Sequence, residues 1–478
     1  MMEENQNPLR VGLCGIGLEA YWPQFDGLRV RLDGYVRQIG KHLEKTGASV
    51  EFLGMVDSPQ SGRDAGHACL RADVDLLIIY VTTYALSSTV LPMVQRAKVP
   101  VLVLNLQPQA AIDYDAFNRL PDRTAMTGEW LAFCSSCSVP EIANVFSRAG
   151  IAFNQVTGVL GDEAVWSEIN AWIQAARVKK ALADNRLGLL GHYYSGMLDI
   201  MTDVTQVSIS FGCHIEQLEV DELSAIRGTV SEAEIAKRIE LFRSHFDVQS
   251  DCAQEELARA ARTSVALDQF TTAHDLQSLA YYHMGSGVPA NEDTMSSIIL
   301  GTSLLTARGV PVAGEYEVKN VLAMKIMDCL GAGGSFSEFY GLDLNANHVL
   351  MGHDGPGHIA IAESKTKVRP LAVFHGKVGR GLSVEMSVKH GPVTLLSIVE
   401  DAAHGFKLLA AHAECVSGEV LHIGNTNSRY RFPIGARGFV EAWNAQGPAH
   451  HCAIGIGHLS GCLSKLAQLL GIPFLQIC

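Results

Sequence analysis

Two hydrophobic periods alternate along the first third of the chain. Short apolar runs, such as VDLLIIYVTT (residues 74–83) and VPVLVLNLQ (residues 99–107), have the continuous hydrophobicity of strands that are covered on both faces. Segments with apolar residues three and four positions apart, such as LDGYVRQIGKHLEKTG (residues 32–47), predict amphipathic helices between them. Strands that alternate with helices predict a parallel, doubly wound α/β sheet.

The pattern changes twice further along the chain. A helical segment at residues 166–185 leads into a second region of α/β rhythm, with helices expected at residues 230–246 and 254–270. After about residue 330 the period becomes two, which predicts an antiparallel sheet or barrel and a closing helix. The strands expected there are residues 371–378, 381–391, 392–401, 405–416 and 428–434, and the helix is residues 458–471. We therefore predict three domains, at residues 1–170, 171–328 and 329–478.

Composition and charge narrow the class of protein. The 478 residues carry a formal net charge of −13, which argues against nucleic acids and anionic membranes as partners. The first residues, MMEENQNPLR, contain no apolar segment typical of a signal peptide, and no apolar run reaches membrane-spanning length. The eleven cysteines are scattered, as in proteins that keep reduced thiols. These features predict a cytoplasmic protein.

Two short motifs have an ordinary structural interpretation. Gly12, Gly15 and Gly17 do not follow the GxGxxG order of a dinucleotide site, so we expect a glycine-lined turn at the end of a strand. Cys134 and Cys137 have CxxC spacing, but no second CxxC accompanies them and the thioredoxin context is missing. We expect buried or partly buried thiols there.

Candidate metal ligands lie near the ends of predicted elements. Glu315 and Glu338 flank a predicted helix, His353 follows a short strand, and His451 belongs to the pair His450–His451 near the end of the chain. Carboxylates with imidazoles form a mixed oxygen and nitrogen set that suits Mn²⁺, Co²⁺, Fe²⁺ or Mg²⁺. The alternative is that these residues are solvated loop carboxylates and capping histidines.

The order of four motifs resembles a known family. GEYEVK, GGSFSEFY, VLMGHDG and AHH (the first three within residues 314–355, the last at 449–451) resemble GEGDWK, GGTSFMEDY, VLGSH and AHH of the metal-dependent L-arabinose isomerase family, and FTTAHDL (residues 270–276) resembles its FTTTFEDL. The resemblance implies an aldose–ketose isomerase with two Rossmann-like doubly wound α/β domains and a C-terminal antiparallel β-barrel domain that carries much of the metal site. It also implies a homo-trimer or homo-hexamer with active sites at subunit junctions.

The resemblance also implies roles for single residues. It makes Glu315, Glu338, His353 and His451 the ligands of a divalent metal, most simply Mn²⁺. The same comparison gives the residues expected to contact the sugar: His450, Tyr340, Glu19 and His274. Glu19 is the nearest counterpart of a substrate-contacting glutamine of the family, and His274 lies near a family aromatic that touches substrate.

Several departures affect the expected pocket. The family's GSQHLYG is replaced by GIGLEAYW (residues 15–22), and its NQTAHGG by NLQPQAA (residues 105–111), which removes a histidine. His353 is followed by DGPGH, which adds Asp354 and His358. Such changes around a complete metal set predict the same chemistry on a different pentose or hexose.

The predicted reaction is metal-stabilised proton transfer through an enediolate, with Glu315 and Glu338 as base and acid. A hydride shift is the alternative route. Two other classes of protein remain open: a non-catalytic sugar-binding or regulatory protein of the same fold, and another metal-dependent carbohydrate enzyme, an aldolase or hydrolase.

Overall fold

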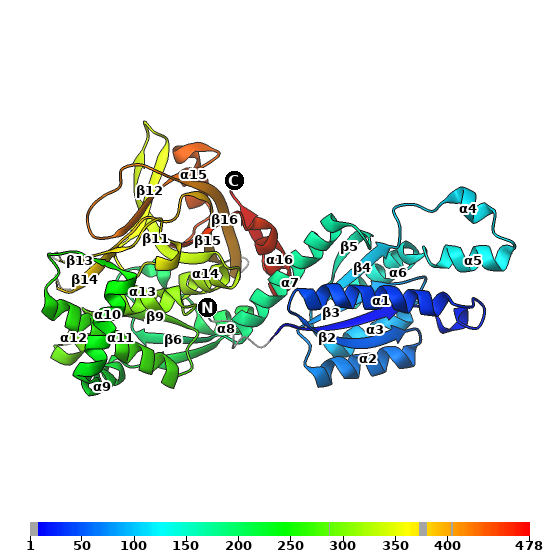
Figure 1. Ribbon diagram of the computed structural model, residues 1–478, viewed down its shortest axis with the longest axis horizontal. Coiled ribbons are helices and arrows are strands. Elements are labelled where there is room, and N and C mark those ends of the chain that lie inside the picture. Colours follow the sequence, from blue (N-terminus) through cyan, green and yellow to red (C-terminus); the bar gives the residue numbers. More distant parts are fainter. Residues whose placement is uncertain (1–7, 286, 372–379, 403–404) are drawn as a thin grey trace. The chain divides into compact units, whose positions relative to one another are not determined.

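The chain folds into two compact units, Met1–Lys180 and Ala181–Cys478. This computed structural model describes residues 8–285, 287–371, 380–402 and 405–478 (Figure 1). Helix α7 (Glu163–Ala183) carries the chain from one unit into the next and runs through residue 170, where we expected a boundary. The expected boundary at residue 328 falls inside the second unit and stays a prediction.

The first unit contains a parallel five-stranded sheet in the order β2-β1-β3-β4-β5. Helices α2, α3 and α6 pack on one another and share a core with the sheet, whereas α1 contributes Leu28 and Leu32 to a separate core cluster. The strands are β1 (Arg10–Ile16), β2 (Ser49–Val56), β3 (Leu76–Val81), β4 (Val101–Gln107) and β5 (Asn154–Val159). The helices before α7 are α1 (Leu28–Lys45), α2 (Pro59–Ala72), α3 (Ser87–Ala97), α4 (Tyr114–Asn118), α5 (Arg123–Leu131) and α6 (Ser135–Arg148).

The two short motifs fall in this unit. A Cβ atom added to Gly15 would lie 2.6 Å from Cγ2 of Val36, so this glycine allows the close approach of α1 to β1. Cys134 is buried and caps α6, Cys137 is exposed, and both are free thiols. Within the described part of the chain, no helix is long and apolar enough to cross a membrane.

The second unit begins with a parallel four-stranded sheet in the order β10-β9-β6-β7. Its strands are β6 (Arg186–Gly191), β7 (His214–Leu218), β9 (Ser278–Tyr282) and β10 (Val312–Ala313). The helices of this region are α8 (Val204–Phe211), α9 (Val220–Thr229), α10 (Glu232–His245), α11 (Gln254–Ala273), α12 (Pro289–Met295) and α13 (Ile299–Ala307). The prediction of parallel α/β structure is confirmed in both units.

An antiparallel sheet follows, in the order β15-β18-β11-β12-β17-β16, with β19 added parallel to β16. Strand β15 pairs with β16 as well as with β18. The strands are β11 (Gly333–Asp343), β12 (His348–His353), β15 (Gly391–Asp401), β16 (Gly405–Val416), β17 (Thr426–Arg431), β18 (His451–Ile456) and β19 (Phe474–Gln476). The helices α15 (Gly435–Asn444) and α16 (Ser460–Leu470) complete this region. The predicted C-terminal antiparallel sheet is confirmed.

A small third sheet joins distant segments of the second unit. It has the order β14-β13-β8, with β8 (Asp247–Val248), β13 (Lys367–Pro370) and β14 (Leu382–Glu385). We expected a strand at residues 371–378, of which residues 372–378 lie outside the described residues. Strand β14 is shorter than the run expected at 381–391, because only residues 382–385 of that run pair with β13.

Helix α14 (Val318–Cys329) connects the two larger sheets of the second unit. It contacts β9 and β10 of the parallel sheet as well as β11, β15 and β18 of the antiparallel sheet. Every residue from Val318 to Met327 is buried, as expected for a helix that is covered on all sides. The N-terminal end of α14 therefore lies where the two sheets meet, and the candidate residues gather there.

Candidate active site

Strand register brings three of the expected ligands together. Glu338 lies on β11, which pairs with β18 on one side and with β12 on the other. Glu338 is directly opposite His451 on β18 and opposite Gly352 on β12, the neighbour of His353. A Cβ atom at Gly352 would lie 1.7 Å from the carbonyl oxygen of Thr426, so only glycine permits this strand spacing. The structure thus places the side chains of Glu338, His353 and His451 next to one another.

Glu315 reaches the same place from a turn after β10. Glu315 and Tyr316 have φ angles of 57° and 67°, in the left-handed region that non-glycine residues rarely adopt. The Tyr316 N–H donates to the carbonyl oxygen of Tyr281 at 3.0 Å, and its hydroxyl donates to Gln217 Oε1 at 2.7 Å. These bonds to two strands of the parallel sheet hold the turn in an unfavourable conformation, which is typical of functional sites.

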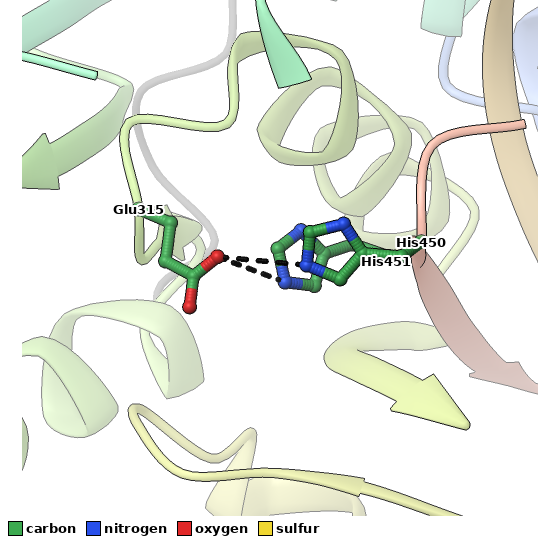
Figure 2. A group of neighbouring side chains, drawn as sticks. All are labelled: Glu315, His450 and His451. Atoms are coloured by element: carbon green, nitrogen blue, oxygen red, sulfur yellow. Dashed lines mark ion pairs between the residues drawn. The ribbon is translucent and has the colours of Figure 1, made fainter. Parts of the chain in front are cut away.

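The carboxylate of Glu315 faces three imidazole rings. Its Oε2 lies 3.3 Å from Nε2 of His451 and 3.6 Å from Nε2 of His450, and its Oε1 lies 3.8 Å from Nε2 of His353. Figure 2 shows Glu315 directed at the rings of both His450 and His451. Two overlapping groups could hold a metal ion, Glu315 with His450 and His451, and Glu338 with His353 and His451.

A buried carboxylate fixes the orientation of His451. Glu317 Oε2 lies 2.8 Å from Nδ1 of His451, and both side chains are at most 1% exposed. Because Nδ1 is engaged, Nε2 presents its lone pair to the cluster, and this buried atom has no hydrogen-bond partner among the described residues. Metal-binding histidines are commonly held in this way by a carboxylate on the other ring nitrogen. The donor set therefore fits a hard or borderline divalent cation.

The charge of the cluster also favours a cation. Burial lowers the pKa of His450, but hydrogen bonds to Glu315 and Asp199 raise it more, to about 9. The carboxylates of Glu315 and Glu338 at Nε2 and of Asp199 at Nδ1 thus create a negative potential around the ring of His450. A positive charge is stabilised at this position.

A cavity of about 30 Å³ adjoins the cluster, enough for an ion or a water molecule. It is lined by Tyr194, Tyr281, Tyr282, Gly314, Glu315, Glu338, His353, Asp354, Gly355 and Pro356. Tyr340 lies at a bulge of β11, and its hydroxyl accepts a hydrogen bond from Asn425 Nδ2 at 3.0 Å. Burial raises the pKa of Tyr340, which keeps its hydroxyl protonated.

Two expected sugar-binding residues belong to other elements of the chain. Glu19 belongs to the first unit, where it is exposed in a short 3₁₀ helix (Glu19–Tyr21). His274 caps α11, and its ring nitrogens contact Glu216 and Glu222 at 2.7 and 2.8 Å. His274 comes before the first residue of β9, whereas the cavity residues Tyr281 and Tyr282 are at the last residues of that strand. The structure does not bring His274 into the cluster, and the roles of both residues stay predictions.

Three residues of the site had no assigned role in the sequence. Glu317 stands two positions after Glu315, a spacing that a search for further carboxylates in GEYEVK would have found. No such signal marks Asp199, in a 3₁₀ helix (Leu198–Ile200), or Lys319. Asp199 contacts His450 and Lys319 contacts Glu317, and both contacts depend on the tertiary structure.

His358, expected beside the metal, is 4% exposed and does not line the cavity. Burial lowers its pKa to about 4. Because this is below the value of about 6.5 in the unfolded chain, the unfolded state binds more protons between these pH values. We expect the free energy of unfolding to fall by about 3 kcal/mol as the pH drops through this window.

Urea unfolding of the wild type and of His358→Leu at pH 7.5 and pH 4.5 tests this expectation. The variant should lose clearly less stability on acidification than the wild type. Equal losses in the two proteins would mean that other groups account for the acid sensitivity.

Comparison with known proteins connects this site to a family. Residues 333–473, which include Glu338, His353 and His451, match the model of the L-arabinose isomerase C-terminal domain. The L-arabinose isomerase of Nocardioides sp. (strain JS614) is 24% identical over 356 residues, covering 70% of this chain and 68% of the relative. The chain is therefore similar to L-arabinose isomerases, from which it diverges in sequence. Similarity to other L-arabinose isomerases extends further along the chain.

Two other relatives show the length and breadth of this similarity. The L-arabinose isomerase of Anoxybacillus flavithermus is 21% identical and aligns with 94% of this chain and 90% of its own length. The sulfoquinovose isomerase of Priestia aryabhattai is 20% identical, with 84% of each chain covered. Relatives named for different sugars thus align with most of this chain at similar identity.

Proposed function

We propose that this protein is a metal-dependent aldose–ketose isomerase that acts on a free pentose or hexose. The observation that carries the proposal is the convergence of Glu315, Glu338, His353 and His451 from three strands and a strained turn. Relatives named L-arabinose isomerase and sulfoquinovose isomerase support the reaction class and leave the sugar open.

These four residues would hold the ion, with Glu317 orienting His451. Their oxygen and nitrogen donors suit Mn²⁺, Co²⁺, Fe²⁺ or Mg²⁺, and the resemblance to the family makes Mn²⁺ the first candidate. When bound, the ion supplies Lewis-acid stabilisation of the negative charge that develops on the sugar oxygens.

The protein's own residues would move the protons. Conversion of an aldose to a ketose transfers one proton from C2 to C1 and another from the O2 hydroxyl to O1. Glu315 and Glu338 are the carboxylates at the cavity, so we assign them the roles of base and acid, exchanged in the reverse direction. His450, whose side chain is 35% exposed, is available to bind a sugar hydroxyl, and Tyr340 supports the adjoining wall.

Incubation with a panel of aldoses and ketoses, with Mn²⁺ or with chelator, tests the proposal. Ketose that forms only with metal is the expected product. Cleavage products would indicate an aldolase or hydrolase, and sugar binding without turnover would indicate a binding protein. Reaction in D₂O separates the routes, because proton transfer through the carboxylates introduces deuterium at C1 and a hydride shift does not.

Metal should also stabilise the folded protein. An ion that binds only the native state at 100 times its Kd raises the free energy of unfolding by about 2.7 kcal/mol. We expect Mn²⁺ to raise the thermal midpoint, EDTA to reverse the shift, and Glu315→Gln to abolish it. The same shift in the variant would place the ion elsewhere.

The resemblance to the family supports further proposals on the barrel, the assembly and the sugar contacts, and the composition supports the cytoplasmic location. The antiparallel sheet is a barrel, for which the pairing of β15 with both β16 and β18 is the expected sign. The protein acts in the cytoplasm as a homo-trimer or homo-hexamer, and Glu19 and His274 contact sugar at subunit junctions. Light scattering of the purified chain tests the oligomeric state.

A further inference from the structure

Asp199 binds His450 through both its backbone and its ring. Its Oδ2 accepts hydrogen bonds from the backbone N–H of His450 at 3.0 Å and from Nδ1 at 2.6 Å. The other ring nitrogen, Nε2, faces Oε2 of Glu315 at 3.6 Å and Oε2 of Glu338 at 3.9 Å. The bond from the backbone N–H places the Asp199 carboxylate next to the ring. The bond from Nδ1 then holds this half-exposed imidazole in the rotamer that faces the cluster.

Lys319 fixes the segment that carries Asp199. Its Nζ donates to the carbonyl oxygens of Asp199 at 2.9 Å and Met201 at 3.1 Å, and the residue is 4% exposed. The same Nζ lies 4.0 Å from Oε1 of Glu317, the carboxylate that holds His451. One buried lysine thus contacts the backbone of Asp199 and the carboxylate of Glu317, the two residues that hold the neighbouring imidazoles by their Nδ1 atoms.

The two imidazoles differ in access to solvent. The side chain of His451 is 0% exposed, whereas that of His450 is 35% exposed. The buried ring can reach only what the cluster encloses, and the exposed ring can meet a ligand that enters from solvent. Each ring needs a carboxylate to direct its Nε2, and Asp199 serves the exposed one.

We propose that Asp199 is a positioning residue, which holds His450 with Nε2 directed at the sugar-binding side of the Glu315–Glu338 pair. This inference rests on the proposed isomerase function for its effect on turnover, but the contact itself is independent of that function. Asp199 acts through His450 and does not touch the reacting atoms.

Kinetics of Asp199→Ala and Asp199→Asn, with the sugar that the wild type converts, test the proposal. We expect Asp199→Ala to raise KM about tenfold and to change kcat less than about threefold. Without Asp199 the His450 ring is poorly oriented and binds the sugar less tightly. Asp199→Asn should stay within about threefold of the wild type, since its amide oxygen can accept both hydrogen bonds. In a His450→Ala background, adding Asp199→Ala should raise KM no further.

Glu363→Ala is a matched control. Glu363 accepts from the backbone N–H of His390 at 2.8 Å and contacts Nδ1 of that ring at 3.2 Å, with similar exposure, and it does not line the cavity. Its KM should equal that of the wild type. A loss of folded protein in Asp199→Ala would lower kcat and leave KM unchanged, so a KM effect separates positioning from a merely structural role.

Crystal structures of Asp199→Ala and Glu363→Ala test the contact without turnover. In Asp199→Ala we expect the His450 ring to turn away from Glu315. In Glu363→Ala we expect the ring to keep its wild-type orientation. An unmoved ring, or an unchanged KM in Asp199→Ala, would overturn the proposal. If the wild type isomerises no sugar, the isomerase function fails, and the crystal structures still decide the role of Asp199.

Discussion

Replacement of Glu315 by Gln is expected to lower kcat/KM for ketose formation by about 10³-fold or more. The change removes one of the two carboxylates assigned to proton transfer, a role that contributes about 10²–10⁴-fold. It also removes a charged ligand that faces three imidazoles in the cluster. Initial rates at saturating Mn²⁺, together with the affinity for Mn²⁺ from isothermal titration calorimetry, measure both losses.

The metal-free variant should be as stable as the wild type or more stable. Glu315 and Glu338 line one small cavity, and carboxylates brought together repel each other unless a cation lies between them. Glutamine preserves the size of the side chain and relieves this repulsion, which offsets the lost attraction between Glu315 and the protonated ring of His450. A thermal midpoint in EDTA that does not fall, together with lost activity, would show that the defect lies in the chemistry and not in folding.

Glu363→Gln is the control for a lost carboxylate beside a histidine. It changes the contact with His390 outside the cavity, so activity should remain within about twofold of the wild type. Activity of Glu315→Gln within tenfold of the wild type would contradict the assignment of Glu315. The ligand set would then have to be built around Glu338 and His353.

Many of the elements could be predicted from local patterns, and the closeness of the candidate ligands could be predicted from the resemblance. Continuous apolar runs predicted β3 and β4 because both faces of a parallel sheet are covered. The resemblance of four short motifs identified Glu315 and His451 as partners, although 135 residues separate them. Short motifs of this kind can indicate a spatial cluster even where the rest of the sequence diverges.

Contacts that depend on tertiary structure could not be predicted. Strand β8 has two residues and exists because β13 pairs with it, so no hydrophobic pattern indicates it. The left-handed conformation of Glu315 is imposed by hydrogen bonds from Tyr316 to distant strands. Asp199 belongs to an exposed segment whose position depends on Lys319 of α14. In each case the determining partner is far away in sequence.

Replacement of Glu317 by Gln is expected to weaken Mn²⁺ binding about 10–100-fold, with a parallel loss of activity at limiting metal. The carboxylate of Glu317 lies 2.8 Å from Nδ1 of His451 and directs Nε2 of the ring at the cluster. An amide oxygen can still accept this hydrogen bond but carries no charge, so the imidazole becomes a poorer ligand. Electron paramagnetic resonance of Mn²⁺ in titrations of both proteins gives the two affinities.

Glu216→Gln provides the matched control, because Glu216 contacts Nδ1 of His274 at 2.7 Å in the same unit, away from the cavity. Its affinity for Mn²⁺ should equal that of the wild type. Excess Mn²⁺ should restore most of the activity of Glu317→Gln but not that of Glu315→Gln, because Glu317 acts through His451 whereas Glu315 is assigned to the proton transfer itself. Unchanged affinity in Glu317→Gln would mean that His451 keeps its orientation without the charge, and that the packing of Phe336 against its ring at 4.4 Å suffices.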